Sequence, residues 1–324
     1  MAKPTAALAT QRPEIRDGLQ QFDFDRSGFI GGRVLPVLEA ESQAGSFSII
    51  PLAQLLQRRK VTRNDRGGYS RSDWHGSTLT YETAEYGFEV PVDHREAAKY
   101  AELWDAEDIS AEMALDVLLR EYEIRAAAAV FNATTWTGAS LTTSVGTEWS
   151  SASSTPIANV KAAIEKVKNG TGVMPNALII NDFVFRNLQN VTEIKDAITA
   201  SGAGQAAKQS DIGPAQLAQV FNLREVIVAD AMYNTAAEGA AASLSPIWSS
   251  EYAMVARIAA PNSTLMKPAI GRTIHWAGDG SRFDGMTETY GDPQTRKTIM
   301  RARHDVQEKI VYAACGHLLS NITA

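Results

Sequence analysis

The sequence is poor in the residues that build covalent or metal-linked frameworks. Cys315 is the only cysteine among 324 residues, so no disulfide can form within the chain. This agrees with a reducing compartment such as a cytoplasm. The five histidines show neither HxH nor HxxxH spacing and are joined by no cysteine cluster, which argues against a zinc site.

Long apolar runs and a basic net charge are also missing. No run approaches the roughly 20 apolar residues of a membrane-spanning helix, and Glu14 and Asp17 argue against an N-terminal secretory signal. The net charge of −6 excludes a chain-wide basic field for nucleic acid. Because 44% of the residues are hydrophobic, the chain can bury a sizeable core. The sequence therefore predicts a globular protein that stays where it is made.

The stretch from Asp108 to Phe131 predicts the dominant helix. It contains no glycine or proline, and most of its residues favour a helix. We expect Asp108 to cap its start and Asn132 to follow its end. At about 1.5 Å per residue, the helix would span roughly 36 Å.

Apolar residues of this helix fall into two stripes rather than one. Leu118, Tyr122 and Ala126 typify one stripe, and Met113 and Val117 typify the other. An ordinary surface helix needs a single apolar face, so we expect this helix to be covered from two sides. Its charged residues should lie between the stripes and form the i,i+4 pairs Asp116–Arg120 and Glu121–Arg125.

The N-terminal part predicts extended structure with little core of its own. Residues 1–45 resemble an arm in which Phe22 and Phe24 are anchors that need a surface. Residues 46–92 begin with a short strand near 46–52, and we interpret 57–92 as a long two-stranded hairpin. An isolated hairpin is marginally stable in water. We therefore expect this loop to lie on a neighbouring subunit, with a solvated hairpin as the alternative.

A cluster of basic residues in this loop is the strongest interaction signal. It comprises Arg58, Arg59, Lys60, Arg63, Arg66 and Arg71. The acidic groups of a neighbouring copy are one class of partner, and we single out Glu82, Glu85 and Glu89. Exposed pairs contribute about 0–1 kcal/mol each, so register is a more plausible role than affinity. DNA phosphates and plain solvent remain alternative partners.

The C-terminal half predicts two units. Residues 155–248 alternate helix and strand and predict a small α/β domain, with buried strands at 177–180 and 225–229. We expect Gly170 to close its first helix and residues 234–246 to form a loose loop. From residue 249 the pattern becomes β-rich, with strands near 252–259, 269–276 and 298–312. We expect the long helix to pack on a sheet formed by these strands.

This order of parts resembles the major capsid proteins of tailed bacteriophages, whose fold encapsulins share. The resemblance covers nearly the whole chain but rests on order and pattern, because the family has no short motif. The segments that carry it are 22–40, 81–132, 176–198, 223–234 and 296–319.

The resemblance implies an α+β shell subunit with five parts. They are the N-terminal arm 1–45, the extended loop 46–92, the peripheral domain 93–154 with spine helix 108–131, the axial domain 155–248, and the peripheral strands with the C-terminus, 249–324.

The resemblance also implies the partners. Such a subunit assembles with itself into hexamers and pentamers of an icosahedral head around double-stranded DNA, inside the host cytoplasm. A separate scaffolding protein is expected, since the chain leaves no room for a long scaffolding segment. A portal and a decoration protein are further expected partners, and a membrane and a cofactor are not.

Two other patterns suggest chemistry. Asp23, Asp25 and Gly28 match the start of an EF-hand calcium loop, but Val34 stands where a bidentate glutamate is required. Cys315 and His317 would face one side of a strand, yet their surroundings predict core rather than a cleft. A turn in the arm and a buried strand are the simpler interpretations.

Three functions therefore remain at this point. The first is a non-enzymatic capsid subunit around DNA, and the second is an encapsulin-like shell around protein cargo. The third is a calcium-dependent or hydrolytic enzyme, for which the sequence offers no converging constellation of polar residues.

Overall fold

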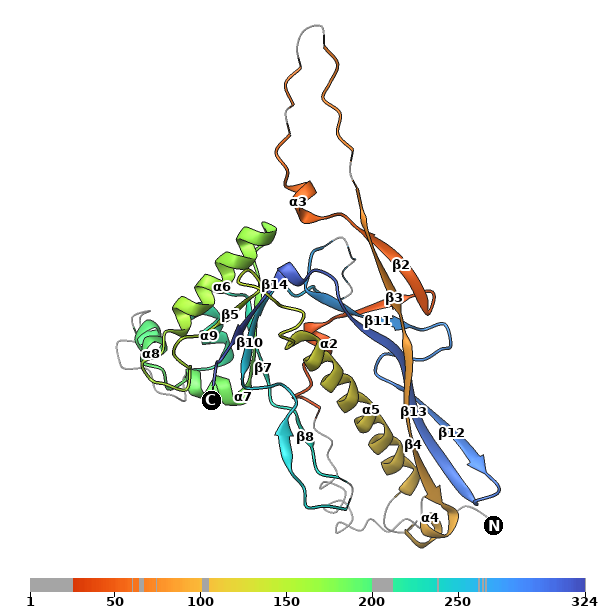
Figure 1. The fold of residues 1–324 in the computed structure, drawn as a ribbon. Helices are drawn as coiled ribbons and strands as arrows, with labels where there is room; N and C mark the ends of the chain where they lie inside the picture. Colours follow the sequence, from red (N-terminus) through yellow and green to blue (C-terminus); the bar gives the residue numbers. More distant parts are fainter. Residues whose placement is uncertain are drawn as a thin grey trace, which may run out of the picture.

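The computed structural model describes most of the chain from residue 26 to residue 323 (Figure 1). Outside the described residues lie 1–25, 60, 64–66, 74, 101–104, 200–211, 238, 262, 264, 266 and 324. The predicted anchors Phe22 and Phe24 are therefore outside the described part, as are Lys60 and Arg66.

Helix α5, Ala106–Val130, is the long helix that the sequence predicts. Its start differs, because Asp105 and not Asp108 is the cap: the Asp105 carboxylate accepts the backbone N–H groups of Glu107 and Asp108. Both residues are acidic, so composition alone could not choose between them.

The stripe that contains Leu118, Tyr122 and Ala126 is buried as predicted. The other stripe is only partly covered within the chain: the side chain of Met113 is 47% exposed, and Val117 is half-buried. The predicted pair Asp116–Arg120 forms at 2.8 Å.

The first sheet combines strands that lie far apart in the sequence. Its central strand is β13, Lys297–Ile310, and β4, Ala84–Asp93, pairs with it along one edge. Along the other edge β13 pairs with β12, Met286–Asp292, and then with β11, Gly271–Trp276. Strand β1, Val37–Ala40, adds a parallel edge to β11. α5 packs on this sheet through β13 and β4.

The alternating run 77–93 does not form one hairpin with the segment before it. Strand β2, Ala44–Ile49, pairs with β3, Ser77–Glu82, while β4 leaves this ribbon to join the first sheet. The expectation of a single hairpin over 57–92 is therefore wrong. The break in the alternation near residue 84 marks the point at which the chain changes partner strands.

The second sheet has the order β5-β14-β10-β6-β7. Its strands are β5, Thr142–Ser144; β14, Gly316–Ser320; β10, Tyr252–Ala256; β6, Ala177–Asn181; and β7, Glu225–Ala229. Strands β6 and β7 are the buried strands predicted for the α/β unit. We expected the strand predicted at 252–259 to belong to the sheet on which the long helix packs. It forms β10, which instead pairs with β14 and β6 in the second sheet.

Helices cover the second sheet (Figure 1). They are α6, Pro156–Thr171; α7, Asp182–Leu188; α8, Thr192–Ile198; and α9, Pro214–Val220. Pro156 occupies the first turn of α6 as predicted. The helix ends at Gly172 rather than Gly170, because Gly172 has the left-handed conformation with φ 72° that closes a helix.

The remaining elements are short. Strands β8, Met232–Asn234, and β9, Leu244–Pro246, form a small hairpin where a loose loop was expected. Helices α2, Gly31–Val34, and α3, Leu52–Leu55, lie in the N-terminal part. The others are α4, His94–Tyr100, before α5, and the 3₁₀ turn η5, Ala313–Cys315, before β14.

One hydrophobic core joins the two sheets. It contains Tyr122, Ala126 and Val130 from α5, Val306 from the first sheet and Met254 from the second. A separate core lies between the second sheet and its helices. The C-terminal half of α5 therefore connects the two layers.

Candidate intersubunit surfaces

The segment between β2 and β3, residues 50–76, is here called the projection, and it stands away from the body of the molecule (Figure 1). Its described residues include four exposed large hydrophobic side chains: Leu55 at 62%, Leu56 at 63%, Val61 at 88% and Tyr69 at 74%. A contiguous exposed apolar patch marks an interaction site, and Leu55 and Leu56 are adjacent in the sequence, so the projection is a candidate interaction surface.

The described basic residues of the projection are exposed and are not engaged by acids. Among the described residues, none of Arg58, Arg59, Arg63 and Arg71 forms an ion pair. Only Arg63 has a fixed position: its Nε donates to the Gly67 carbonyl at 2.9 Å and its guanidinium lies 5.1 Å from the Tyr69 ring centre. Their intersubunit role remains a prediction.

Two of the three predicted acidic partners are engaged within their own chain. Glu85 lies 3.6 Å from Arg303, and Glu89 lies 2.5 Å from Arg301. Glu82 ends β3, and its backbone N–H donates to the Gln307 side chain at 3.1 Å. These carboxylates are therefore less available to a neighbouring copy than the sequence suggests, and that role stays a prediction.

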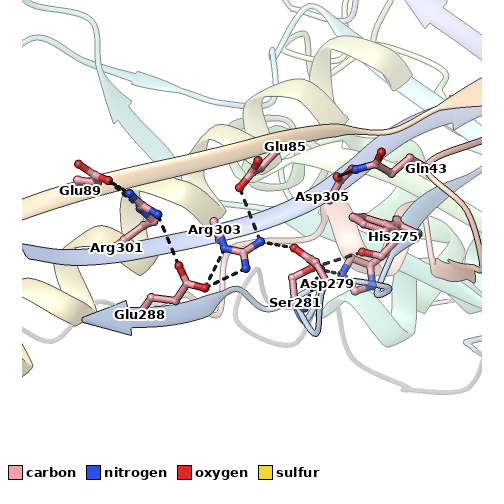
Figure 2. Close-up of polar contacts among 11 residues, drawn as sticks. Gln43, Glu85, Glu89, His275, Asp279, Ser281, Glu288, Arg301, Arg303 and Asp305 are labelled. Carbon is pink, nitrogen blue, oxygen red and sulfur yellow. Dashed lines mark hydrogen bonds and ion pairs between the residues drawn. The ribbon is translucent and has the colours of Figure 1, made fainter. Parts of the chain in front are cut away.

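Glu85 and Glu89 belong to a larger cluster, the outer polar network, on the face of the first sheet that points away from α5 (Figure 2). Arg301 is directly opposite Glu89 on β4 and Glu288 on β12. Arg303 binds Glu288 at 2.9 Å and also binds Asp279. Cross-strand pairs of opposite charge stabilise a sheet, so the network ties the β12–β13 hairpin to β4.

Asp279 is the most strongly shifted carboxylate of this network. Partial burial acts to raise its pKa, but hydrogen bonds from Ser281 and the Arg303 guanidinium outweigh burial and lower the pKa to about 2. Asp279 is therefore ionised throughout the physiological range and is committed to its own chain.

The outer polar network was missed from the sequence, although a signal was present. In β13, Arg301 and Arg303 alternate with the buried Met300, Ala302 and His304. This alternation assigns both arginines to one face. The alternation does not predict which acidic residues lie opposite the two arginines, because Glu89 on β4 is 212 residues from Arg301 in the sequence.

A second polar contact fixes the arm to the body. The Glu123 carboxylate accepts the backbone N–H groups of Ile30 and Gly31, each at 2.8 Å, and the indole N–H of Trp248 at 2.6 Å. Burial raises the pKa of Glu123, while the three donors act in the opposite direction. Glu123 of α5 therefore binds both the arm, through Ile30 and Gly31, and the segment before β10, through Trp248.

Three charged residues of α5 are placed differently from the prediction. Asp116 and Glu123, expected between the apolar stripes, are buried. The expected pair Glu121–Arg125 does not form, because Arg125 binds Glu308 of β13 at 3.2 Å. Spacing along a helix predicts only pairs within that helix, and Arg125 pairs instead with Glu308, which is distant in the sequence.

The structure places Cys315 and His317, the candidate thiol and imidazole, in the buried core. Cys315 lies in η5 and not on the strand of His317, and burial raises the pKa of its thiol to about 11. His317 contacts the Ser140 carbonyl at 3.0 Å and Thr143 at 2.8 Å. Asp23 and Asp25 of the calcium-loop pattern are outside the described residues.

The described part of the chain lacks both a clustered metal site and a membrane-spanning helix. It contains no group of three or more His, Cys, Asp or Glu side chains arranged to hold a metal ion. None of its helices is both long enough and apolar enough to cross a membrane.

Comparison with known proteins shows to which family the chain belongs. The family model described as phage capsid protein matches residues 76–310, which is most of the chain. The chain belongs to the phage capsid protein family. Its role as a structural subunit of a capsid shell follows from that membership. None of the curated proteins compared with this capsid protein is similar to it.

Solved structures show the same fold at low sequence identity. A phage-related protein from Bordetella bronchiseptica RB50 is 17% identical, with a TM-score of 0.66 over 96% of this chain and 97% of the other. The capsid protein of cyanophage P-SCSP1u is 11% identical, with a TM-score of 0.58 over 89% and 86%. The SrpI encapsulin of Synechococcus elongatus PCC 7942 is 9% identical, with a TM-score of 0.52 over 99% and 92%.

Proposed function

We propose that this capsid protein assembles into hexamers and pentamers of an icosahedral phage head that encloses double-stranded DNA. The observation that carries the proposal is the projection. It exposes Leu55, Leu56, Val61 and Tyr69, and beyond its base, where Leu56 packs against Gly172, it stands away from its own body (Figure 1). Burial of apolar surface is the main driving force of association, and a neighbouring copy supplies the missing cover.

The proposal assigns roles to the parts of the chain. Residues 155–248, with β10 and β14, form the axial domain around the symmetry axes, and the first sheet with α5 forms the peripheral domain. The partners are further copies, a separate scaffolding protein, a portal and a decoration protein, with DNA on the inner face. Assembly takes place in the host cytoplasm, and no catalytic step is part of the proposal.

Charge reversal in the projection tests the role of its arginines in assembly. Arg58→Glu, Arg59→Glu and Arg63→Glu together should leave the subunit folded, because these side chains are exposed and make no ion pair in the described part of the chain. We expect loss of particles in negative-stain electron micrographs, with an unchanged circular dichroism spectrum. The matched control replaces the same three residues by lysine and should still assemble. Normal particles from the triple glutamate variant would contradict the intersubunit role.

A protein-cargo shell is the second candidate function, because the SrpI encapsulin shares the fold over 99% of this chain. The nucleic-acid content of particles purified from phage-producing cells separates the two. A phage head should carry double-stranded DNA that is protected from nuclease. Particles that contain only protein cargo would favour the second function.

A further inference from the structure

A polar cavity of about 580 Å³, here called the arm cavity, lies where β1 of the arm meets the first sheet. Strand β1 contributes Val37, Leu38 and Glu39, and the connection between β11 and β12 contributes Phe283 and Asp284. Cavities that bind small molecules measure about 300–1,000 Å³. The arm cavity is therefore large enough for a small ligand, which would touch the arm and the β11–β12 connection together.

The charged side chains that line the arm cavity are net negative. Glu39 and Asp284 are exposed, and neither forms an ion pair with another described residue. Among the described residues that line the cavity, Arg282 is the only base, so it balances one of the two acids. The cavity therefore favours a cation over an anion.

His275 of β11 presents an unpartnered polar atom at this cavity. The residue lines the cavity, yet it is only 2% exposed. Its Nδ1 has no hydrogen-bond partner among the described residues. A buried polar atom without a partner is rare in folded proteins and calls for an explanation, and a ligand in the cavity provides one.

The neighbours of His275 decide which ring nitrogen carries the hydrogen. Ser281 contacts both His275 and Asp279 (Figure 2), and its hydroxyl donates to the Trp276 carbonyl at 3.3 Å and to the Asp279 carboxylate. The single hydroxyl hydrogen of Ser281 is therefore committed to an oxygen. We assign the ring hydrogen to Nε2 of His275, which lies 3.4 Å from the Ser281 oxygen and donates to it.

The ring of His275 is neutral near pH 7. Burial lowers its pKa below the usual 6.5, and the carboxylates of Glu39 and Asp284 are among the groups that act against burial. A neutral imidazole carries one N–H, so with the hydrogen on Nε2 the Nδ1 atom is a bare acceptor. The cavity therefore offers Nδ1 and two carboxylates as acceptors, and a ligand rich in hydrogen-bond donors fits them.

A protonated aliphatic amine has the matching chemistry. A primary ammonium carries three N–H donors and no acceptor. Val37, Leu38 and Phe283 supply apolar surface for its methylene groups, and an aromatic ring face attracts a cation. A metal ion fits less well, because the described residues contain no group of three or more His, Cys, Asp or Glu side chains arranged to hold one.

We propose that the arm cavity binds a small aliphatic amine in its protonated form, with the ammonium group between Glu39, Asp284 and the Nδ1 atom of His275. Bound there, the amine bridges β1 and the β11–β12 connection and so ties the arm to the first sheet. The site lies within one subunit and does not depend on the proposed assembly.

Isothermal titration calorimetry of the full-length, unassembled subunit with putrescine measures this binding. Putrescine should bind, and its neutral isostere 1,4-butanediol should not. Glu39→Gln and Asp284→Asn should each weaken putrescine binding by about fivefold, the upper range for an exposed ion pair. The matched control is Glu41→Gln, which removes an exposed charge two residues from Glu39 and outside the cavity lining. It should weaken binding by less than about twofold, because salt screens a charge that makes no direct contact.

Nitrogen-15 NMR of the histidine-labelled subunit observes the proposed acceptor directly. The Nδ1 resonance of His275 should move upfield when putrescine is added, because a bare imidazole nitrogen then accepts a hydrogen bond. In the double variant Glu39→Gln with Asp284→Asn, the same addition of putrescine should leave this resonance in place.

Three results would each overturn the site: no heat of binding with putrescine, equal binding of putrescine and 1,4-butanediol, or equal affinities of Glu39→Gln and Glu41→Gln. All three are measured on the unassembled subunit, so they leave the proposed shell function untouched. Conversely, a wild-type chain that binds putrescine but never forms particles would overturn the shell function and leave the arm cavity as a binding site.

Discussion

Glu123→Ala is the sharpest test of how the capsid subunit is held together. The change removes the common acceptor of three buried donors, the N–H groups of Ile30, Gly31 and the Trp248 indole. A buried donor left without a partner costs about 1–3 kcal/mol, so three would cost about 3–9 kcal/mol. Burial raises the pKa of Glu123, which shows that its ionised form is itself unfavourable and that removing it recovers part of the loss. We expect a net destabilisation of about 3 kcal/mol.

Urea unfolding of the unassembled subunit, followed by tryptophan fluorescence, measures this loss. The matched control is Glu121→Ala, since Glu121 is exposed on the same helix and forms no ion pair with another described residue. It should change the free energy of unfolding by less than about 0.5 kcal/mol. Glu123→Gln should fall between the two, because its amide keeps one acceptor oxygen. If Glu123→Ala were no less stable than Glu121→Ala, the junction would contribute nothing to stability.

Three further changes test other parts of the fold. Burial lowers the pKa of His304 from 6.5 to about 4. The unfolded chain therefore binds this proton more tightly, and wild-type stability should fall by up to about 3 kcal/mol as the pH drops through that window. His304→Asn should flatten this slope in urea titrations at several pH values. Gly31→Ala places a methyl group 2.7 Å from a Glu123 oxygen and 2.9 Å from Ala126. It should destabilise by about 1–3 kcal/mol, and an unchanged melting temperature would contradict the packing. Arg303→Met should destabilise by about 1–2 kcal/mol at low salt and by less at high salt. Equal urea midpoints for Arg303→Met and wild type at low salt would show that the outer polar network is energetically neutral.

Local signals in the sequence predicted elements well, because they depend on neighbouring residues. The composition of 108–131 predicted α5, and Pro156 marked the start of α6. The apolar runs at 177–180 and 225–229 gave two strands of the second sheet. Each of these signals is complete within a few turns of helix or a few residues of strand.

Partners across long distances could not be predicted, because alternation reveals a strand but not its neighbour. The run after Ala84 pairs with β13 and not with the loop before it. Likewise the sequence places Glu123 with the charges between the apolar stripes and gives no sign of its three donors, which lie 93 and 92 residues before it and 125 residues after it.

The position of β14 has a consequence for biosynthesis. Strand β14 lies inside the second sheet, between β5 and β10, and Ile322 just after it is buried. Contacts between residues distant in sequence slow folding, because the chain between them must first be ordered. A nascent chain in which residues 316–320 have not yet left the ribosome therefore cannot complete this sheet, because β5 and β10 both lack the partner strand that they share.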